Sequence, residues 1–288
     1  MDFVAQETQL YRTSIISYVY RLTGSLEEAQ DITQETMIKY VNIASNEIEN
    51  PKAWMFKVAT NLAWDFLKSA RMRYQSYKGP FLPEPFVNEA YALSDEIELD
   101  ESLSMALWVL MQKLSTKEKI AYILHDIFDF SHHEIANIMD VSVANSRKIS
   151  SRANQKLHSD RVKFSPTKED HELLVNSFLL AIKTGDFDGL QSIFSAEISF
   201  ISDGGGKARA AQKIIHGNRA VALFVHKTIA KSLLEKDEFL SVEYFYFNGS
   251  LGLLVKYHNH VITALNFTTY KNKIHTICVL RNPDKLLF

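Results

Sequence analysis

The sequence predicts a chain of several domains, in which two all-α domains are followed by one α+β domain. Its 288 residues, 46% of them hydrophobic, are too many for one small core and indicate two or three domains. Apolar residues recur at helical spacing from Phe3 to about Arg73 and again from Leu103 to Leu157. After Pro166, helical segments precede β-rich runs, which is the order of an α+β domain.

The first helical block contains signals that begin and end its helices. Gly24 ends one helix, and Ser25 with Glu28 has the pattern of a capping box that begins the next. Pro51 is expected to open a third helix, because the first helical position needs no backbone N–H. The second helix has a polar and acidic face, which is either ordinary solvated surface or a contact surface and contains Asp31, Gln34, Glu35 and Ile38.

A linker is predicted over residues 79–102, between the two helical blocks. It begins with GPFLPEP, whose prolines disfavour helix and stiffen the chain. From Glu84 to Glu101 its only charges are negative. The second helical block, 103–163, follows directly.

The third block, which we place at 170–288, begins with helices and ends in strands. Its first elements are expected at 170–184, 186–194, Ile198–Ile201 (a strand) and after Gly217. Four β-rich runs follow, separated by short turn sequences such as Asn248-Gly249. The runs are Phe239–Phe247, Leu251–Tyr257, Val261–Thr269 and Ile274–Leu280. This order predicts helices that cover one face of a curved antiparallel sheet.

The net charge of −2 gives no overall reason to expect a nucleic-acid partner, since phosphate binding usually needs a strongly basic domain. The distribution is less even. Residues 50–79 contain one acid, Asp65, among many cations, and residues 142–164 contain only Asp160. Each basic block by itself is most simply a solvated charge run. Segment 50–73 also interleaves aromatic rings with its cations, a composition that suits a helix core or a binder of single-stranded nucleic acid.

Two strings in the first block carry a family resemblance. LTGSLEEAQDITQETMIKYV followed by NPKAWMFKVATNLAWDFLKSARMR resembles region 2 of bacterial extracytoplasmic-function sigma factors. The resemblance implies a helical bundle over 1–78 whose acidic face, Asp31 to Ile38, meets the clamp coiled coil of RNA polymerase. It also implies that the third helix opens and holds the promoter −10 element. Lys68 stands where the family usually has Arg, which keeps the charge but loses bidentate geometry. The implied −10 contacts are Trp54, Lys57, Asn61, Trp64, Asp65, Lys68, Arg71 and Arg73.

Residues 132–152 fit a helix-turn-helix, in which a braced recognition helix projects polar and basic groups into a major groove. The segment is similar to sigma region 4, which reads the −35 element and contacts the polymerase flap. Asp140 replaces the customary turn glycine and needs a left-handed backbone, and Ser146 replaces a core valine. The expected −35 contacts are Asn145, Arg147, Lys148, Arg152 and Lys156.

The third block resembles the SnoaL-like branch of the NTF2-like cone fold. Three strings match the sigma-factor subfamily that carries such an extension: FLPEP, DGGGK and NPDKL. The resemblance implies that the extension modulates the sigma factor in cis. We expect the glycines and Lys207 to form a nest of N–H groups for the linker, although a plain flexible loop is the alternative. The expected regulatory residues are Phe81, Leu82, Pro83, Glu84, Pro85, Asp203, Gly204, Gly205, Gly206, Lys207, Asn282, Pro283, Asp284, Lys285 and Leu286.

Other functions remain open for the extension. The cone fold often hosts an acid/base pair, so the extension could instead retain cyclase or isomerase activity, or bind a small ligand without turnover. The candidate groups have no fixed mutual geometry and are Asp203, His216, His226, Tyr244, Tyr246 and His275. We expect no enzyme activity. A factor that binds duplex DNA unaided is a further alternative, but it would have no use for a polymerase-binding surface.

The sequence gives no sign of a cofactor, a metal site or a membrane segment. The sequence has a single cysteine, Cys278, which excludes a disulfide framework. His132 and His133 are expected to be exposed helix-start residues rather than metal ligands. The polar amino terminus and the lack of a long apolar run argue against a signal peptide or a membrane span. We therefore expect a cytoplasmic protein.

Overall fold

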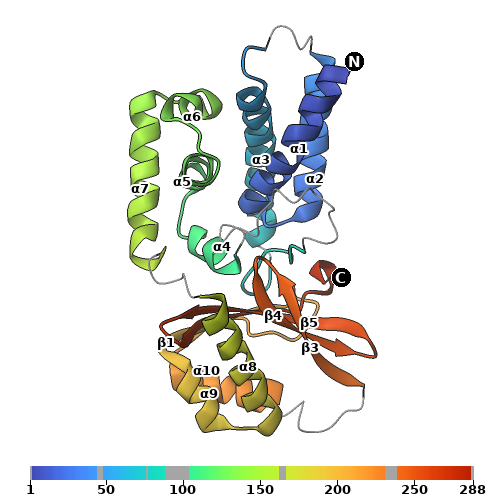
Figure 1. Ribbon diagram of the computed structural model, residues 1–288, viewed down its shortest axis with the longest axis vertical. Helices are drawn as coiled ribbons and strands as arrows, with labels where there is room; N and C mark the ends of the chain where they lie inside the picture. The colour runs from blue at the N-terminus through green and yellow to red at the C-terminus, as the bar shows by residue number, and fades with distance from the viewer. Residues whose placement is uncertain are drawn as a thin grey trace. The chain divides into compact units, whose positions relative to one another are not determined.

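The structure, a computed structural model, describes residues 2–43, 48–75, 77–87, 104–161, 167–230 and 239–286. The chain divides into two compact units. One is formed by Met1–Ser76 with Trp108–Ser159, and the other by Tyr77–Leu107 with Asp160–Phe288. The first is all-α, and the second contains a sheet with helices (Figure 1). The predicted fold class, helical domains followed by an α+β domain, is confirmed.

The amino-terminal helices form a bundle around aromatic and aliphatic side chains. Their bounds are α1 Asp2–Thr23, α2 Leu26–Asn42 and α3 Pro51–Gln75. Ser25 caps α2 as expected, because its side chain accepts from the Glu28 N–H at 3.4 Å. Tyr18 is fully buried, and its hydroxyl lies 2.7 Å from Thr60 Oγ1, which satisfies a polar group that burial would otherwise penalise.

The second set of helices contains the predicted helix-turn-helix. The bounds are α4 Met105–Met111, α5 Thr116–Tyr122, the π-helix η4 Ile123–Ile127, α6 His132–Met139 and α7 Val143–Arg161. Full capping boxes begin two of them, Ser115 with Glu118 and Ser131 with Glu134. Asp140 ends α6 at φ 52° and ψ 51°, so the left-handed turn expected at this residue is confirmed.

The α+β unit begins with helices and continues into the sheet. Helices are α8 Lys168–Thr184, α9 Phe187–Ile193, α10 Asn218–Val225 and the π-helix η5 His226–Ala230. Strands are β1 Phe194–Asp203, β2 Ile215–His216, β3 Leu240–Phe247, β4 Ser250–Tyr257, β5 His260–Tyr270 and β6 Lys273–Leu280. In the described residues the sheet order is β2-β1-β6-β5-β4-β3. The meander is antiparallel, and β1 joins β6 in parallel.

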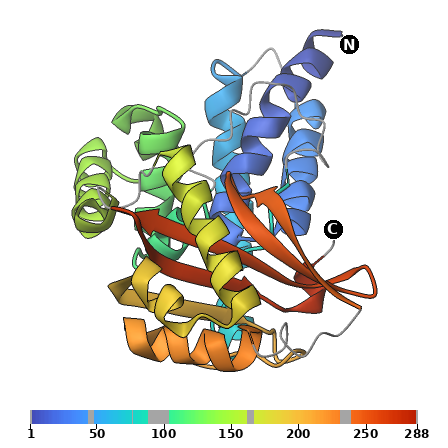
Figure 2. The same cartoon turned by 60° about the horizontal axis from the view of Figure 1, so that its bottom comes forward.

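Helices α8 to α10 lie against one face of this sheet, as Figures 1 and 2 both show. The core fills the space between them, with the Phe178 and Phe267 rings 4.9 Å apart. Register shifts in three strand pairs mark bulges, which curve a sheet. The hairpin turns have positive φ at both central residues, including Asn248 and Gly249, because that conformation matches the twist of the flanking strands.

Candidate functional site

Helix α2 separates a buried face from an exposed one. Thr33 and Thr36 are buried, and the cost of burying their hydroxyls is offset because both donate to carbonyls of their own helix, at 2.6 and 2.8 Å. The opposite face is exposed and contains Asp31, Gln34, Glu35 and Ile38. Ile38 is 52% exposed and Val41, which the sequence did not single out, is 59% exposed. Acidic groups beside exposed apolar side chains suit a protein partner better than they suit water alone.

Helix α3 presents the predicted polar stripe. Asn61, Asp65 and Lys68 are all exposed, and the ammonium of Lys68 lies 3.1 Å from Asp65 Oδ1. Trp54 and Trp64 are half-buried beside this stripe. The backbones of Arg71 and Arg73 belong to α3, but their side chains lie outside the described residues.

One flank of α3 packs against the helix-turn-helix region inside the same unit. The Phe56 ring lies 5.3 Å from Phe128 and 4.9 Å from Phe130. Lys57 forms an ion pair with Asp140 at 2.9 Å. Lys57 is a predicted −10 contact and Asp140 is the turn residue before α7, so a side chain expected to meet DNA here meets another part of the protein.

Helix α7 exposes the predicted recognition residues. Asn145, Arg147, Lys148 and Arg152 are exposed, while Ile149 is buried. The expectation that His132 is exposed was wrong. His132 is half-buried, and its Nδ1 lies 3.3 Å from the hydroxyl of the buried Ser146. The buried serine hydroxyl therefore has a polar partner. His133 is exposed, as expected.

Lys156 differs from the other predicted −35 residues because it has a partner within its own domain. Its ammonium lies 2.8 and 2.7 Å from the two carboxylate oxygens of Glu118, whose side chain is 10% exposed. Burial opposes ionisation of Glu118, but hydrogen bonds from Lys156 and Ser115 and the Lys156 charge hold the pKa of Glu118 below its ordinary value. The pair joins α5 to α7 and so positions the recognition helix.

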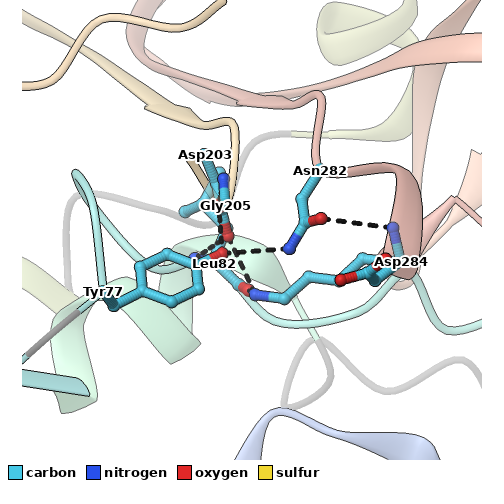
Figure 3. A network of polar contacts seen from close by, with 7 residues as sticks. Tyr77, Leu82, Asp203, Gly205, Asn282 and Asp284 are labelled. Atoms are coloured by element: carbon cyan, nitrogen blue, oxygen red, sulfur yellow. Dashed lines mark hydrogen bonds and ion pairs between the residues drawn. The ribbon is translucent and has the colours of Figure 1, made fainter. Parts of the chain in front are cut away.

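The three strings of the linker and the extension meet at one buried carboxylate (Figure 3). Asp203 is fully buried, and its Oδ2 accepts from the Leu82 backbone N–H at 2.9 Å and from the Lys285 ammonium at 2.8 Å. Its Oδ1 accepts from the Tyr77 hydroxyl and from the Gly205 N–H. We call Tyr77, Leu82, Asp203, Asn282 and Lys285 the linker clamp.

Lys285 ties the linker to the carboxyl end of the chain. Its ammonium also donates to the Leu82 carbonyl at 2.5 Å and lies 3.3 Å from the centre of the Phe81 ring. Asn282 donates to the Tyr77 hydroxyl at 3.1 Å (Figure 3). Burial lowers the pKa of Lys285, and the negative charge of Asp203 opposes that shift. Each of the two groups has several hydrogen-bond partners, which offset the cost of its burial.

A second contact holds the linker four residues further on. Asn248, 1% exposed, accepts from the Phe86 N–H through Oδ1 at 3.1 Å and donates its own N–H to the Phe86 carbonyl at 2.9 Å. The sequence indicated Asn248 only as a hairpin turn residue. Tyr77 was missed as well, although it lies just before the proline-rich string.

The expected glycine nest is not what holds the linker. The Gly205 N–H donates to Asp203, and Lys207 pairs with Asp284 at 2.5 Å. The absence of a side chain at Gly205 instead lets Asn282 pack closely against the backbone, since a Cβ on Gly205 would lie 2.4 Å from Asn282 Nδ2. The predicted nest of N–H donors was therefore wrong. The extension supplies an acceptor, the Asp203 carboxylate, and the donor is the backbone N–H of Leu82 in the linker. Most of the acidic part of the linker, from residue 88, lies outside the described residues.

The candidate acid/base groups of the extension are dispersed. Asp203 belongs to the linker clamp, His216 pairs with Ser199 at the edge of the sheet, and Tyr246 donates to Glu172. His226 packs edge-on against Phe187, His275 lies beside Tyr270, and Tyr244 is exposed on β3. Over the described ranges, no group of three or more His, Cys, Asp or Glu side chains has an arrangement that could hold a metal ion. None of the helices in those ranges is long and apolar enough to cross a membrane.

Comparisons with known proteins agree with this division. Family models match at residues 8–73 (sigma-70 region 2) and at residues 104–157 (sigma-70, region 4). The chain is 30% identical to the ECF RNA polymerase sigma factor SigJ of Mycobacterium tuberculosis, over 97% of this chain and 92% of that protein. The crystal structure of the M. tuberculosis extracytoplasmic function sigma factor SigJ superposes with a TM-score of 0.78 at 25% identity, covering 98% of this chain and 97% of that one. The ECF sigma factor SigM of Bacillus subtilis is 25% identical over 52% of this chain and 89% of its own length.

Proposed function

This chain belongs to the extracytoplasmic-function sigma factors, which direct core RNA polymerase to promoters, and we propose that its α+β domain restrains that activity by holding the linker between the two sigma domains. The domains in this proposal are region 2 over 1–78, the linker over 79–102, region 4 over 103–163 and the regulatory domain over 170–288. The observation that carries it is the buried contact of Asp203 with Leu82 and Lys285.

Connectivity gives the linker clamp its effect. Helix α3 ends at Gln75 and the clamp begins at Tyr77, while α4 begins only at Met105. If the whole stretch between α3 and α4, about 29 residues, were free, it could extend to at most ~100 Å. With the chain held as far as Phe86, only the residues between Phe86 and α4 can extend, to ~60 Å. Region 4 is covalently joined to the α+β domain at its other end as well. Holding the linker therefore shortens the distance over which regions 2 and 4 can separate to reach two promoter elements.

The surfaces on the two sigma domains complete the proposal. The α2 face of Asp31, Gln34, Glu35 and Ile38 binds the clamp coiled coil of core polymerase, with Val41 extending it. Helix α3 holds the −10 element and α7 reads the −35 element, with region 4 on the polymerase flap. Among the α7 residues we give Lys156 the smallest part in DNA binding, since Glu118 already neutralises it. Charge reversal at Asp31 is expected to weaken polymerase binding, whereas Glu197→Lys, at an exposed position of the α+β domain, leaves it unchanged.

Run-off transcription with core polymerase tests the regulatory proposal. The full-length Asp203→Ala variant is expected to give more transcript than the wild type at limiting polymerase, because the linker is released. Asp284→Ala removes the exposed pair with Lys207 and is the matched control. Equal or lower output from a folded Asp203→Ala protein whose linker has become accessible to protease would overturn the proposal.

A further inference from the structure

The α+β domain contains a cavity that the linker clamp does not use. Its volume is about 500 Å³, within the range of small-molecule sites. Apolar side chains from the sheet and from α10 form its walls, among them Phe200, Phe224, Leu265 and Val279. All of these lie within one unit of the structure. A cavity of this size and lining favours a compact apolar molecule.

The charged groups of the lining are all of one sign. Arg209, Lys227 and Arg281 border the cavity, and the described part of the chain places no Asp or Glu on its wall. Cations that border one apolar cavity repel one another, and an anion bound between them offsets that repulsion. The charge of the lining therefore selects for a negative ligand and against a neutral or cationic one.

Arg281 shows where that negative charge belongs. One terminal nitrogen, Nη1, donates to the Arg209 carbonyl at 2.7 Å, while Nε is buried and has no hydrogen-bond partner among the described residues. A buried N–H of a guanidinium that stays unpaired costs free energy, because it has lost its water. The Arg281 side chain also borders the cavity, so an anionic group bound there would offset the cost of its buried charge. Burial also lowers the pKa of Arg281, which reports the same desolvation.

We propose that this cavity binds a carboxylate-bearing apolar molecule, with the carboxylate on Arg281 and the apolar body against Phe200, Phe224 and Leu265. Arg209 and Lys227, which are both exposed, border the same cavity and add to its positive charge. The site is a binding site and not a catalytic one, since the candidate acid/base groups named above do not line it.

The position of Arg281 connects the cavity to the linker clamp. Its backbone N–H donates to the Asp203 carbonyl at 2.7 Å, and the next residue, Asn282, donates to the same carbonyl at 3.0 Å. Asn282 then reaches Tyr77 (Figure 3). A ligand that fixes Arg281 fixes the strand end on which the clamp is built, so its occupancy stabilises the held linker. This consequence rests on the proposed regulatory function, but the binding itself does not.

Calorimetry on the full-length chain tests the binding with decanoate as probe and decanol as the matched neutral molecule, both below their aggregation concentrations. Decanoate is expected to bind at least tenfold more tightly than decanol. Arg281→Gln is expected to lose at least tenfold in decanoate affinity, and Lys227→Gln, at an exposed position, two- to fivefold. Arg219→Gln, an exposed arginine away from the cavity, should change nothing.

Equal affinities for decanoate and decanol, or no binding of either, would overturn the proposal. If Arg281→Gln does not fold, the Lys227→Gln and Phe224→Ala variants decide it: unchanged decanoate affinity in both contradicts the assigned site. Protease cleavage of the linker with and without decanoate is measured separately. Binding without any change in cleavage would leave the ligand site standing and remove only its connection to the clamp.

Discussion

Two lysine–aspartate pairs of nearly equal length hold different parts of this protein. Lys57 and Asp140 are 2.9 Å apart and join region 2 to the helix-turn-helix, with side chains 38% and 76% exposed. Lys285 and Asp203 are 2.8 Å apart and join the linker to the α+β domain, with side chains 7% and 0% exposed. Distance alone would rank them as equal. Burial and the number of further partners show that one contact opens easily and the other does not.

The exposed pair contributes little. Water and salt compete for both charges, and such pairs are typically worth below ~1 kcal/mol. The buried pair is embedded in hydrogen bonds from Leu82, Tyr77 and Gly205, and removing one member of such a pair typically costs about 3–5 kcal/mol. The Lys57–Asp140 pair can therefore yield to a binding partner, whereas linker release needs a specific cause. Four changes can break or sharpen this comparison.

The largest effect is expected from Asp203→Ala. It leaves the Lys285 ammonium buried without its carboxylate, so the held linker should lose about 3–5 kcal/mol of stabilisation. Amide hydrogen exchange over residues 77–87, measured by mass spectrometry, should then lose about 10²- to 4 × 10³-fold protection. Asp284→Ala removes an exposed partner and serves as the control. Unchanged protection in the Asp203 variant would remove the distinction between the two pairs.

Asn248 is expected to have the next largest effect. Asn248→Gly keeps the positive φ of 50° available but removes the acceptor of the Phe86 N–H, at a cost of about 1–3 kcal/mol. Exchange at the Phe86 amide should rise by at least tenfold. Asn272→Gly changes a turn residue of similar φ, 55°, for which the described residues show no hydrogen bond to the linker, and it should leave that amide unchanged. Equal exchange rates at the Phe86 amide in the two variants would contradict the proposal that Asn248 holds the linker at Phe86.

Glu118 provides a pH test of the helix-turn-helix region. Its pKa is lower in the folded chain than its ordinary value. Such a carboxyl adds stability above its unfolded pKa, about 4.3, and loses it as pH falls through the folded pKa. Glu118→Gln should therefore lower the Tm of this region at pH 7, and the difference from wild type should shrink below pH ~4. Glu197→Gln, at an exposed position, should show no difference. A difference that stays constant down to pH 3 would contradict the assignment.

The smallest effect is expected at the exposed pair. Asp140→Asn keeps a residue that tolerates the left-handed turn and removes the charge opposite Lys57. A double-mutant cycle with Lys57→Gln, measured by thermal unfolding, should give a coupling below ~1 kcal/mol that disappears in high salt. A salt-resistant coupling of several kcal/mol would show that this exposed pair is as strong as the buried one.

Sequence periodicity and motifs predicted the helices, strands and turns of this molecule more accurately than the contacts between its side chains. The buried and exposed faces of α2 follow directly from helical spacing, and Asp140 was expected in its left-handed turn. Three strings were expected to act together, but the donors and acceptors between them were not. Pairing depends on which buried group lacks a partner, and only the three-dimensional structure shows that Asp203 accepts from the Leu82 backbone.

Other features had no local signal at all. The parallel pairing of β1 with β6 joins segments about 80 residues apart, and a meander pattern does not indicate it. The ion pair of Lys156 with Glu118 joins two different helices and had no signal in the sequence, and the DNA contact of Lys156 stays a prediction. The cavity is assembled from separate strands, a loop and helix α10, so Arg281 carried no pattern that would have marked it.

The most direct test of the central account is the distance between regions 2 and 4 in the full-length chain. Cys278 is buried, so fluorophores can be attached at Ser69→Cys and Gln155→Cys, both exposed positions. Energy transfer between them is followed as core polymerase is added. Release of the linker by Asp203→Ala should let regions 2 and 4 move apart at a lower polymerase concentration than in the wild type or the Asp284→Ala control. Identical titrations for all three proteins would contradict the claim that the buried clamp limits how far the sigma domains separate.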